Sequence, residues 1–212
     1  MKNLFLILFF FLCKVSLCQL VIQGDVTDAF QGDTLYNSPN EAFNDKAKVR
    51  QINKSKSKFE IRLYTHRSLS NTTVVRIISI EDTTWQAIEL NEKNRPISIK
   101  RKKLFAIPNF ETVIKKLLSY NILNLPNQKE IEYKMRKDTI ELVDGEYQTI
   151  TKKVDVMDGE SYSIEIKIGD KFRIYRFENP DTYLKYYPKV NELENYANII
   201  RTFERELMNN NR

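Results

Sequence analysis

Histidine and cysteine, the residues that most often supply nucleophiles and metal ligands, are scarce in this chain. One histidine, His66, and two cysteines, Cys13 and Cys18, occur among 212 residues. Zinc sites need several Cys or His ligands, and both cysteines lie in or at the edge of a segment that we expect to be removed. A Ser-His-Asp triad would have to use His66, and no Gly-x-Ser-x-Gly elbow is present. We predict no metal site, and we expect His66 to be a surface residue at a strand end.

Carboxylates are the remaining candidates for acid–base chemistry. The chain has neither a Gly-x-x-x-x-Gly-Lys nor a Gly-x-Gly-x-x-Gly motif, which disfavours nucleotide enzymes and leads us to expect no cofactor. Four acids belong to or adjoin expected strands and could pair across neighbouring strands: Glu60, Glu89, Asp155 and Glu165. Alternating strand glutamates more often form the solvent face of a sheet. A small hydrolase or transferase that uses carboxylates alone stays open as the alternative function.

Two groups of side chains could form an interaction surface. The first is a run of four cations that suits an anionic polymer: Lys100, Arg101, Lys102 and Lys103. The same run suits an edge strand, because natural sheets use edge charges to prevent edge-to-edge pairing. The second is a group of tyrosines near the C-terminus: Tyr183, Tyr186 and Tyr187. Amphipathic rings favour interfaces, and they equally close one end of a core.

The first eighteen residues have the layout of a secretory signal peptide. Lys2 precedes the apolar run Leu4–Leu12, and a cleavage-type site ends at Cys18. The apolar run is shorter than the roughly 20 residues that a membrane-spanning helix needs. We predict cleavage before Gln19 and a secreted or periplasmic mature protein without a transmembrane span. A lipid anchor on Cys18 is the alternative, although Leu17 is larger than the residue expected before a lipidated cysteine.

Composition and charge narrow the class of partner. The formal net charge is +6, and loss of Lys2 and Lys14 with the leader leaves +4. A mildly basic secreted protein favours anionic surfaces, and the compartment argues against nucleic acid. The Cys18–Gln19 junction and the Asn-, Lys-, Ile- and Tyr-rich composition resemble small secreted proteins of AT-rich bacteria. That resemblance implies association with a bacterial envelope.

Periodicity locates the first set of strands. Residues 19–57 are polar and are expected to be a flexible lead-in with a short helix over 41–52. Phe59–His66 alternates between apolar and polar residues, which predicts a half-buried strand. Thr73–Ile80 is β-branched and apolar, and Thr83–Leu90 follows after another short turn. The three strands predict an antiparallel meander.

A helix and a second set of strands follow. Pro108 and Asn109 open a helix with an apolar stripe at helical spacing: Phe110, Val113, Ile114, Leu117 and Leu118. Three further strands are expected beyond it: Gln148–Val156, Tyr162–Ile168 and Phe172–Phe177. Asp158-Gly159 and Gly169-Asp170 mark the turns between these strands.

The most strongly indicated helix is the last one. Asn179 and Pro180 form a start signal, and Pro188 kinks the helix or restarts it. The apolar stripe that follows must bury against a sheet: Val190, Leu193, Ala197, Ile200, Phe203 and Leu207.

These elements predict an α+β fold with an antiparallel sheet of about six strands, arranged as two three-stranded meanders. The middle helix and the long C-terminal helix should pack on one face. We expect a signal peptide over 1–18, the lead-in over 19–57, one domain over 58–208 and a disordered tail over 209–212. The favoured function is a non-enzymatic binding protein whose partner is another envelope protein or an anionic glycan.

Overall fold

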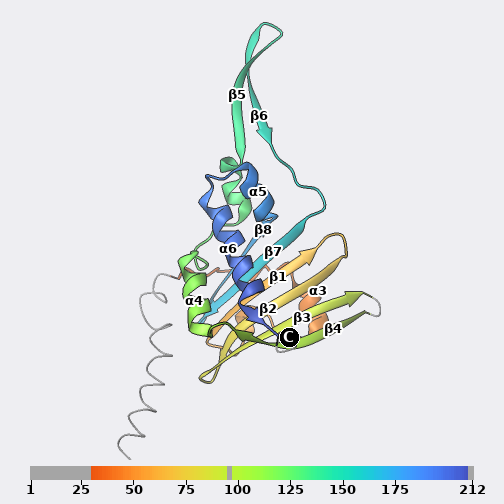
Figure 1. The fold of residues 1–212 in the computed structure, drawn as a ribbon, viewed down its shortest axis with the longest axis vertical. Coiled ribbons are helices and arrows are strands. Elements are labelled where there is room, and N and C mark those ends of the chain that lie inside the picture. The colour runs from red at the N-terminus through yellow and green to blue at the C-terminus, as the bar shows by residue number, and fades with distance from the viewer. Residues whose placement is uncertain (1–29, 95–96, 210–212) are drawn as a thin grey trace, which may run out of the picture.

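The computed structural model describes residues 30–94 and 97–209. Seven strands form the main sheet: β1 (Phe59–Arg67), β2 (Thr72–Glu81), β3 (Thr84–Asn94), β4 (Ile97–Ala106), β7 (Glu160–Ile168), β8 (Lys171–Glu178) and β9 (Leu207–Met208). Two strands form a second sheet: β5 (Arg136–Val143) and β6 (Glu146–Lys153). Both sheets are antiparallel, so the α+β class with an antiparallel sheet is confirmed (Figure 1).

Four α-helices and two 3-10 helices complete the regular secondary structure of the described residues. The α-helices are α3 (Glu41–Ala47), α4 (Phe110–Ser119), α5 (Pro180–Tyr186) and α6 (Asn191–Arg205), and the 3-10 helices are η1 (Ile52–Lys54) and η2 (Gln128–Lys134). Within the described ranges, no helix has the length and apolar character needed to cross a membrane. The expected signal peptide over 1–18, residues 19–29 of the lead-in and residues 210–212 of the tail lie outside the described residues.

The strand order differs in detail from two separate meanders. The order in the main sheet is β8-β7-β1-β2-β3-β4-β9, so the β7–β8 hairpin pairs with β1 rather than with a third strand of its own. The expected strand over Gln148–Val156 corresponds to β6, which pairs with β5 outside the main sheet. Its alternation carries only a narrow apolar face, because most of its side chains are polar, and it therefore has little to bury in the core.

The main hydrophobic core lies between one face of the sheet and the helices α4 and α6. Asn109 caps α4 by accepting a hydrogen bond from the Thr112 N–H at 2.9 Å. Phe110 of α4 stacks on Trp85 of β3, and Tyr196 of α6 stacks on Phe177 of β8 with ring centroids 4.3 Å apart. The predicted stripe of the C-terminal helix is buried: Val190, Leu193, Ala197, Ile200 and Phe203. Both helices thus cover the same face, as the periodicity predicts.

A smaller cluster lies on the opposite face of the sheet, which we call the second face. Phe43 of α3 packs edge-on against Tyr64 of β1, with Val75 and Leu90 beside them. α3 is the short helix expected in the lead-in, and it ends at Lys48, whose left-handed backbone (φ 55°) stops the helix. The polar segment before β1 therefore supplies the cover for this face.

Side chains from distant loops satisfy the outer edge of β8. The N–H groups of Ile174, Arg176 and Glu178 point away from β7 and donate to oxygens of three side chains: Asp33, Asn127 and Gln128. An edge whose donors are occupied does not template pairing with another chain. The opposite edge is different, because β9 pairs with β4 only at Phe105 and Ala106.

Candidate functional site

Strand alternation places an unusual set of charges on the second face. In β1 the side chains of Phe59, Ile61 and Leu63 point into the main core, so Glu60, Arg62 and Tyr64 point the other way. Arg62 lies opposite Glu165 of β7, and Tyr64 lies opposite Ser163. We call Glu60, Arg62, Tyr64 and Glu165 the Arg62 cluster.

The Arg62 cluster is buried and closely paired. The Arg62 Nε lies 2.6 Å from Glu60 Oε1, and its Nη1 lies 3.2 Å from Glu165 Oε2. The Arg62 side chain is 2% exposed and that of Glu165 is 0% exposed. A buried ion is tolerated only when it is paired and its remaining hydrogen bonds are made. The residues that make those bonds therefore decide whether this arrangement is stable.

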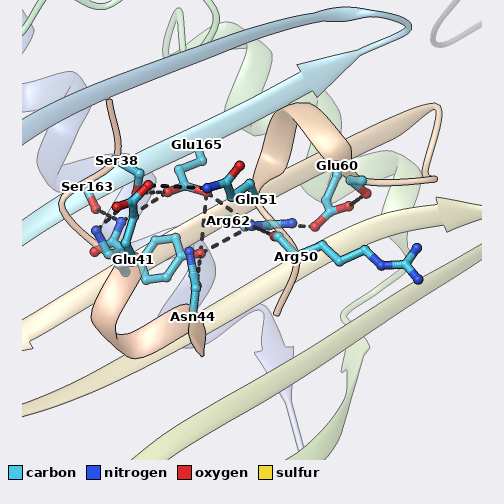
Figure 2. Close-up of polar contacts among 12 residues, drawn as sticks. Ser38, Glu41, Asn44, Arg50, Gln51, Glu60, Arg62, Ser163 and Glu165 are labelled. Carbon is cyan, nitrogen blue, oxygen red and sulfur yellow. Dashed lines mark hydrogen bonds and ion pairs between the residues drawn. The ribbon is translucent and has the colours of Figure 1, made fainter. Parts of the chain in front are cut away.

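The segment 38–57 supplies the missing hydrogen bonds, as Figure 2 shows. Ser38 donates to Glu165 Oε1, and the Asn40 amide donates to Ser163 Oγ at 2.8 Å. Tyr64 donates to Asn44 Oδ1 at 2.9 Å. The contacts of Ser38 and Asn40 join residues 127 and 123 positions apart in the chain, and all three contacts fix the start of α3 on the sheet.

A second group of contacts holds the loop that follows α3. The Arg62 Nη1 donates to the Arg50 carbonyl at 2.8 Å, and Ser55 Oγ donates to Glu60 Oε2. Lys167 of β7 donates to the Ser55 carbonyl. Arg62 therefore contacts a loop carbonyl and two carboxylates, and Lys167 contacts a second loop carbonyl.

The chemistry available to the Arg62 cluster follows from this pairing. Each oxygen of Glu60 and Glu165 accepts at least one hydrogen bond from a side chain. Burial, followed by the negative charge of Glu165, raises the pKa of Tyr64 above its ordinary value, so the hydroxyl stays protonated and donates. The cluster acts as an internal anchor for the 38–57 segment.

The four candidate carboxylates are not brought together as an acid–base pair. Glu60 and Glu165 share the Arg62 guanidinium. Glu89 lies on the other face of the sheet, where it pairs with Arg76 at 3.0 Å and with Lys102 at 3.5 Å. Asp155 follows β6 and has a largely exposed side chain.

His66 occupies the open end of the second face. It belongs to β1, is half-buried, and its Nδ1 lies 3.3 Å from Thr73 Oγ1. It lines a hollow of about 590 Å³ together with Lys46 and Glu92, which form an ion pair at 3.0 Å. No group of three or more His, Cys, Asp or Glu side chains suited to a metal occurs in the described part of the chain.

The basic run predicted as one surface is divided between two faces. It lies in β4, and strand alternation puts Lys100 and Lys102 on the core side and Arg101 and Lys103 on the second face. Lys102 pairs with Glu89, and Lys103 lies 5.6 Å from the centre of the Phe105 ring. Only part of the run is therefore available to any one ligand.

The tyrosines predicted as the other surface have three different environments. Tyr183 is buried in the core, and Tyr187 is half-buried with its hydroxyl accepting from the Val154 N–H at 2.9 Å. Tyr186 is exposed. The group mainly closes the end of the core, with one ring facing solvent.

An exposed element that was predicted only in part is the hairpin of β5 and β6, which we call the arm; the expected strand over Gln148–Val156 overlaps β6, and β5 was not predicted. Figure 1 shows it projecting from the body beyond α5. Its turn, Asp144-Gly145, has positive φ at both residues (51° and 84°), as a type I′ turn requires. An Asp-Gly pair between alternating segments was the signal that could have revealed the arm.

Comparison with protein families, with curated proteins and with solved structures finds no match for this chain.

Proposed function

We propose that this chain is a non-enzymatic binding protein of a secreted or periplasmic compartment, and that it holds another protein through the arm. The observation that carries the proposal is a set of large apolar side chains on one face of the arm. Ile140, Leu142 and Tyr147 are 74%, 63% and 82% exposed. The register places Leu142 directly opposite Tyr147. Ile140 lies two residues before Leu142 in β5, so its side chain is on the same face.

The energetics of an isolated hairpin support a partner. A two-stranded hairpin is marginally stable in water unless a hydrophobic face packs against something else. The arm forms its own two-stranded sheet, separate from the seven-stranded one, so its apolar face remains open to solvent. Contiguous exposed apolar side chains on a projecting element are typical of protein–protein contact sites.

The enzymatic alternative has less geometric support. It requires two acids that converge in a cleft, whereas Glu60 and Glu165 converge on Arg62, and Glu165 is fully buried. Both carboxylates accept hydrogen bonds from the 38–57 segment and hold it on the sheet. We therefore propose binding as the function and assign the acids to structure.

Paired variants of the arm test the proposal. Leu142→Thr/Tyr147→Thr removes the apolar face and keeps strand propensity. Glu141→Thr/Gln148→Thr changes the neighbouring cross-strand pair on the opposite face and serves as the control. Each variant is used as bait for native extracytoplasmic proteins, and each recovered protein is then purified and its Kd measured.

The expected result is one protein bound by the wild type and the control, and bound at least about tenfold more weakly by Leu142→Thr/Tyr147→Thr, since burying two large side chains contributes several kcal/mol. Equal binding by all three proteins would remove the arm from the interface. Loss of a wild-type dimer in the apolar-face variant, with no other protein bound, would instead make the partner a second copy.

The compartment is tested separately. We expect the mature protein to begin at Gln19, because the cleavage-type site ends at Cys18. Intact-mass measurement of the natively expressed protein checks this. A retained Met1 would place the protein elsewhere, and a diacyl mass on Cys18 would show a lipid anchor.

A further inference from the structure

A second hollow on the second face is lined by four exposed cations that form no ion pair with any described residue. It has a volume of about 460 Å³ and lies between the loop 48–57 and strands β2 to β4. Four exposed cations line it: Lys48, Arg50, Lys56 and Arg101. Within residues 30–94 and 97–209, none of these four forms an ion pair, in contrast to Arg62 at the same site.

Three acids line this hollow, and two of them accept hydrogen bonds from neighbouring side chains. Glu60 is held by Arg62 and Ser55, and Glu81 accepts a hydrogen bond from Gln86 at 3.0 Å. Asp82 is the remaining acid in the lining. The single charge of Arg62 is shared by Glu60 and Glu165, so the Arg62 cluster carries one excess negative charge. The four exposed cations outnumber this charge and those of Glu81 and Asp82, so the hollow presents a small positive surplus to solvent.

The cations stand on a backbone that is already held in place. Arg62 fixes the Arg50 carbonyl at 2.8 Å, and Lys167 holds the Ser55 carbonyl. In Figure 2 the Arg50 guanidinium extends away from the Arg62 cluster while its carbonyl side faces that cluster. The loop is thus ordered before a ligand arrives, which lowers the entropic cost of binding.

The spacing of the four cations favours a ligand that carries several negative charges. Arg50 is anchored over β1, and Arg101 projects from β4, three strands away. Neighbouring strands lie about 4.8 Å apart, so the two backbones are separated by roughly 14 Å. Because the four cations are spread over this distance, a chain with repeated anionic groups can pair with more of them than a single small anion can.

The floor of the hollow favours a sugar chain over a single-stranded nucleic acid. Ser57, Ser79 and Gln86 offer hydroxyl and amide groups, and Ile77 and Ile88 supply a small apolar surface. The described residues that line this hollow include no aromatic ring on which a base could stack. From these observations we infer that the hollow binds a glycan segment carrying several sulfate, phosphate or uronate groups, a function separate from that of the arm.

Matched charge variants test this inference. Lys48→Gln/Arg50→Gln/Arg101→Gln removes three cations from the hollow, and Lys129→Gln/Lys185→Gln/Lys189→Gln removes three exposed cations elsewhere. Both variants have the same net charge. Binding of a heparin-derived hexasaccharide, an oligogalacturonate, a short polyphosphate and a single-stranded DNA oligonucleotide is measured by calorimetry, with the urea midpoint as the check of folding.

We expect at least one of the first three probes to bind the wild type, and the hollow variant to bind it about tenfold to a hundredfold more weakly. The control variant should stay within about twofold. The tightest probe identifies the anionic group. The single variants Arg50→Gln and Arg101→Gln should each weaken binding, which keeps the test valid if the triple variant is unstable.

Three results would overturn the inference. The first is equal weakening of binding in both triple variants, since global charge would then explain binding. The second is DNA that binds as tightly as the glycan probes and is lost in the hollow variant, and the third is no binding of the three anionic probes. The arm variant Leu142→Thr/Tyr147→Thr should retain glycan binding. Failure of the arm proposal is therefore distinguishable from failure of this one.

Discussion

Single residues of the Arg62 cluster perform a task that hydrophobic side chains perform elsewhere in this sheet. Arg62 contacts Glu60 and Glu165 and also holds the Arg50 carbonyl, so one guanidinium links two strands to a loop. Buried ions cost solvation energy, and replacing a whole buried pair by apolar residues is often neutral. Removing Arg62 alone is different, because it leaves two carboxylates buried without a counter-ion.

Glu165→Gln tests how much the buried Arg62–Glu165 pair contributes to stability. It should lower the free energy of unfolding by about 1 to 3 kcal/mol, because a neutral amide makes weaker hydrogen bonds with Arg62 and Ser38 in this buried site, while Arg62 keeps Glu60 as its counter-ion. Urea unfolding measures the change. Glu178→Gln, at an exposed position of β8, should stay within about 0.5 kcal/mol. A loss below about 1 kcal/mol for Glu165→Gln would mean that the pair is only weakly coupled to folding.

At the scale of elements, the helices and the arm have opposite relations to the core. α6 buries an apolar stripe against the sheet, and Phe203 is fully buried in it. The arm carries exposed apolar residues and pairs only within itself as a sheet. The first element should therefore be essential for folding and the second dispensable.

Phe203→Ala should lower the free energy of unfolding by about 3 to 5 kcal/mol, because it deletes a large side chain from a closed core. Truncation at Pro188 should prevent folding, since it removes the whole of α6. Thermal and urea unfolding measure both effects, with Glu204→Ala on the exposed side of α6 as the control. An unchanged melting temperature for Phe203→Ala would place this stripe outside the core.

Excision of the arm should leave the body stable. Replacing residues 137–152 by Asn-Gly joins Arg136 to Lys153, which are paired across the base of the arm. Because the excised pairs are internal to the arm, the melting temperature should change little. Loss of cooperative unfolding in this variant would show that the arm contributes to the body's stability after all.

At the scale of the whole molecule, buried tyrosines tie the loop after α4 to the main core. Tyr175 donates to the Ile122 carbonyl at 2.8 Å, and Tyr196 donates to the Pro126 carbonyl. Burial is the largest cause that raises the pKa of both hydroxyls, and it also raises that of Tyr64. All three therefore stay protonated in the folded state well above the ordinary value near 10.

This predicts a loss of stability at alkaline pH. Below about pH 10 both states keep the tyrosine protons, and above it the unfolded chain loses protons that the folded protein retains. Each of the three tyrosines then lowers the free energy of unfolding by about 1.4 kcal/mol per pH unit. Together they lower it by up to about 4 kcal/mol for each pH unit above about 10. Urea midpoints from about pH 8 to about pH 11 measure this, and Tyr196→Phe should lessen the slope. A flat profile would contradict the tyrosine account.

Local signals in the sequence determined the type of most elements. The period-two pattern from Phe59 identifies the side of β1 that faces the main core, although the opposite side, which was expected to face solvent, is buried as well. Asn109 with the stripe that follows predicts α4. The C-terminal stripe identifies the buried side of α6 in the same way, so the fold class could be derived without coordinates. The arm was predicted only in part: the expected strand over Gln148–Val156 overlaps β6, whereas β5 was missed because it has no wide apolar face. Asp144-Gly145 marks the turn between them.

Tertiary structure alone decided which distant residues meet. Ser38, Arg62 and Glu165 are far apart in the chain, and only the pairing of β7 with β1 brings them together. The basic hollow likewise combines one residue of the predicted basic run, Arg101, with cations of the loop after α3. Periodicity reports which side of a strand is buried, because that depends on near neighbours in the chain. It carries no information on which strand lies alongside, since many pairings would bury the same apolar face.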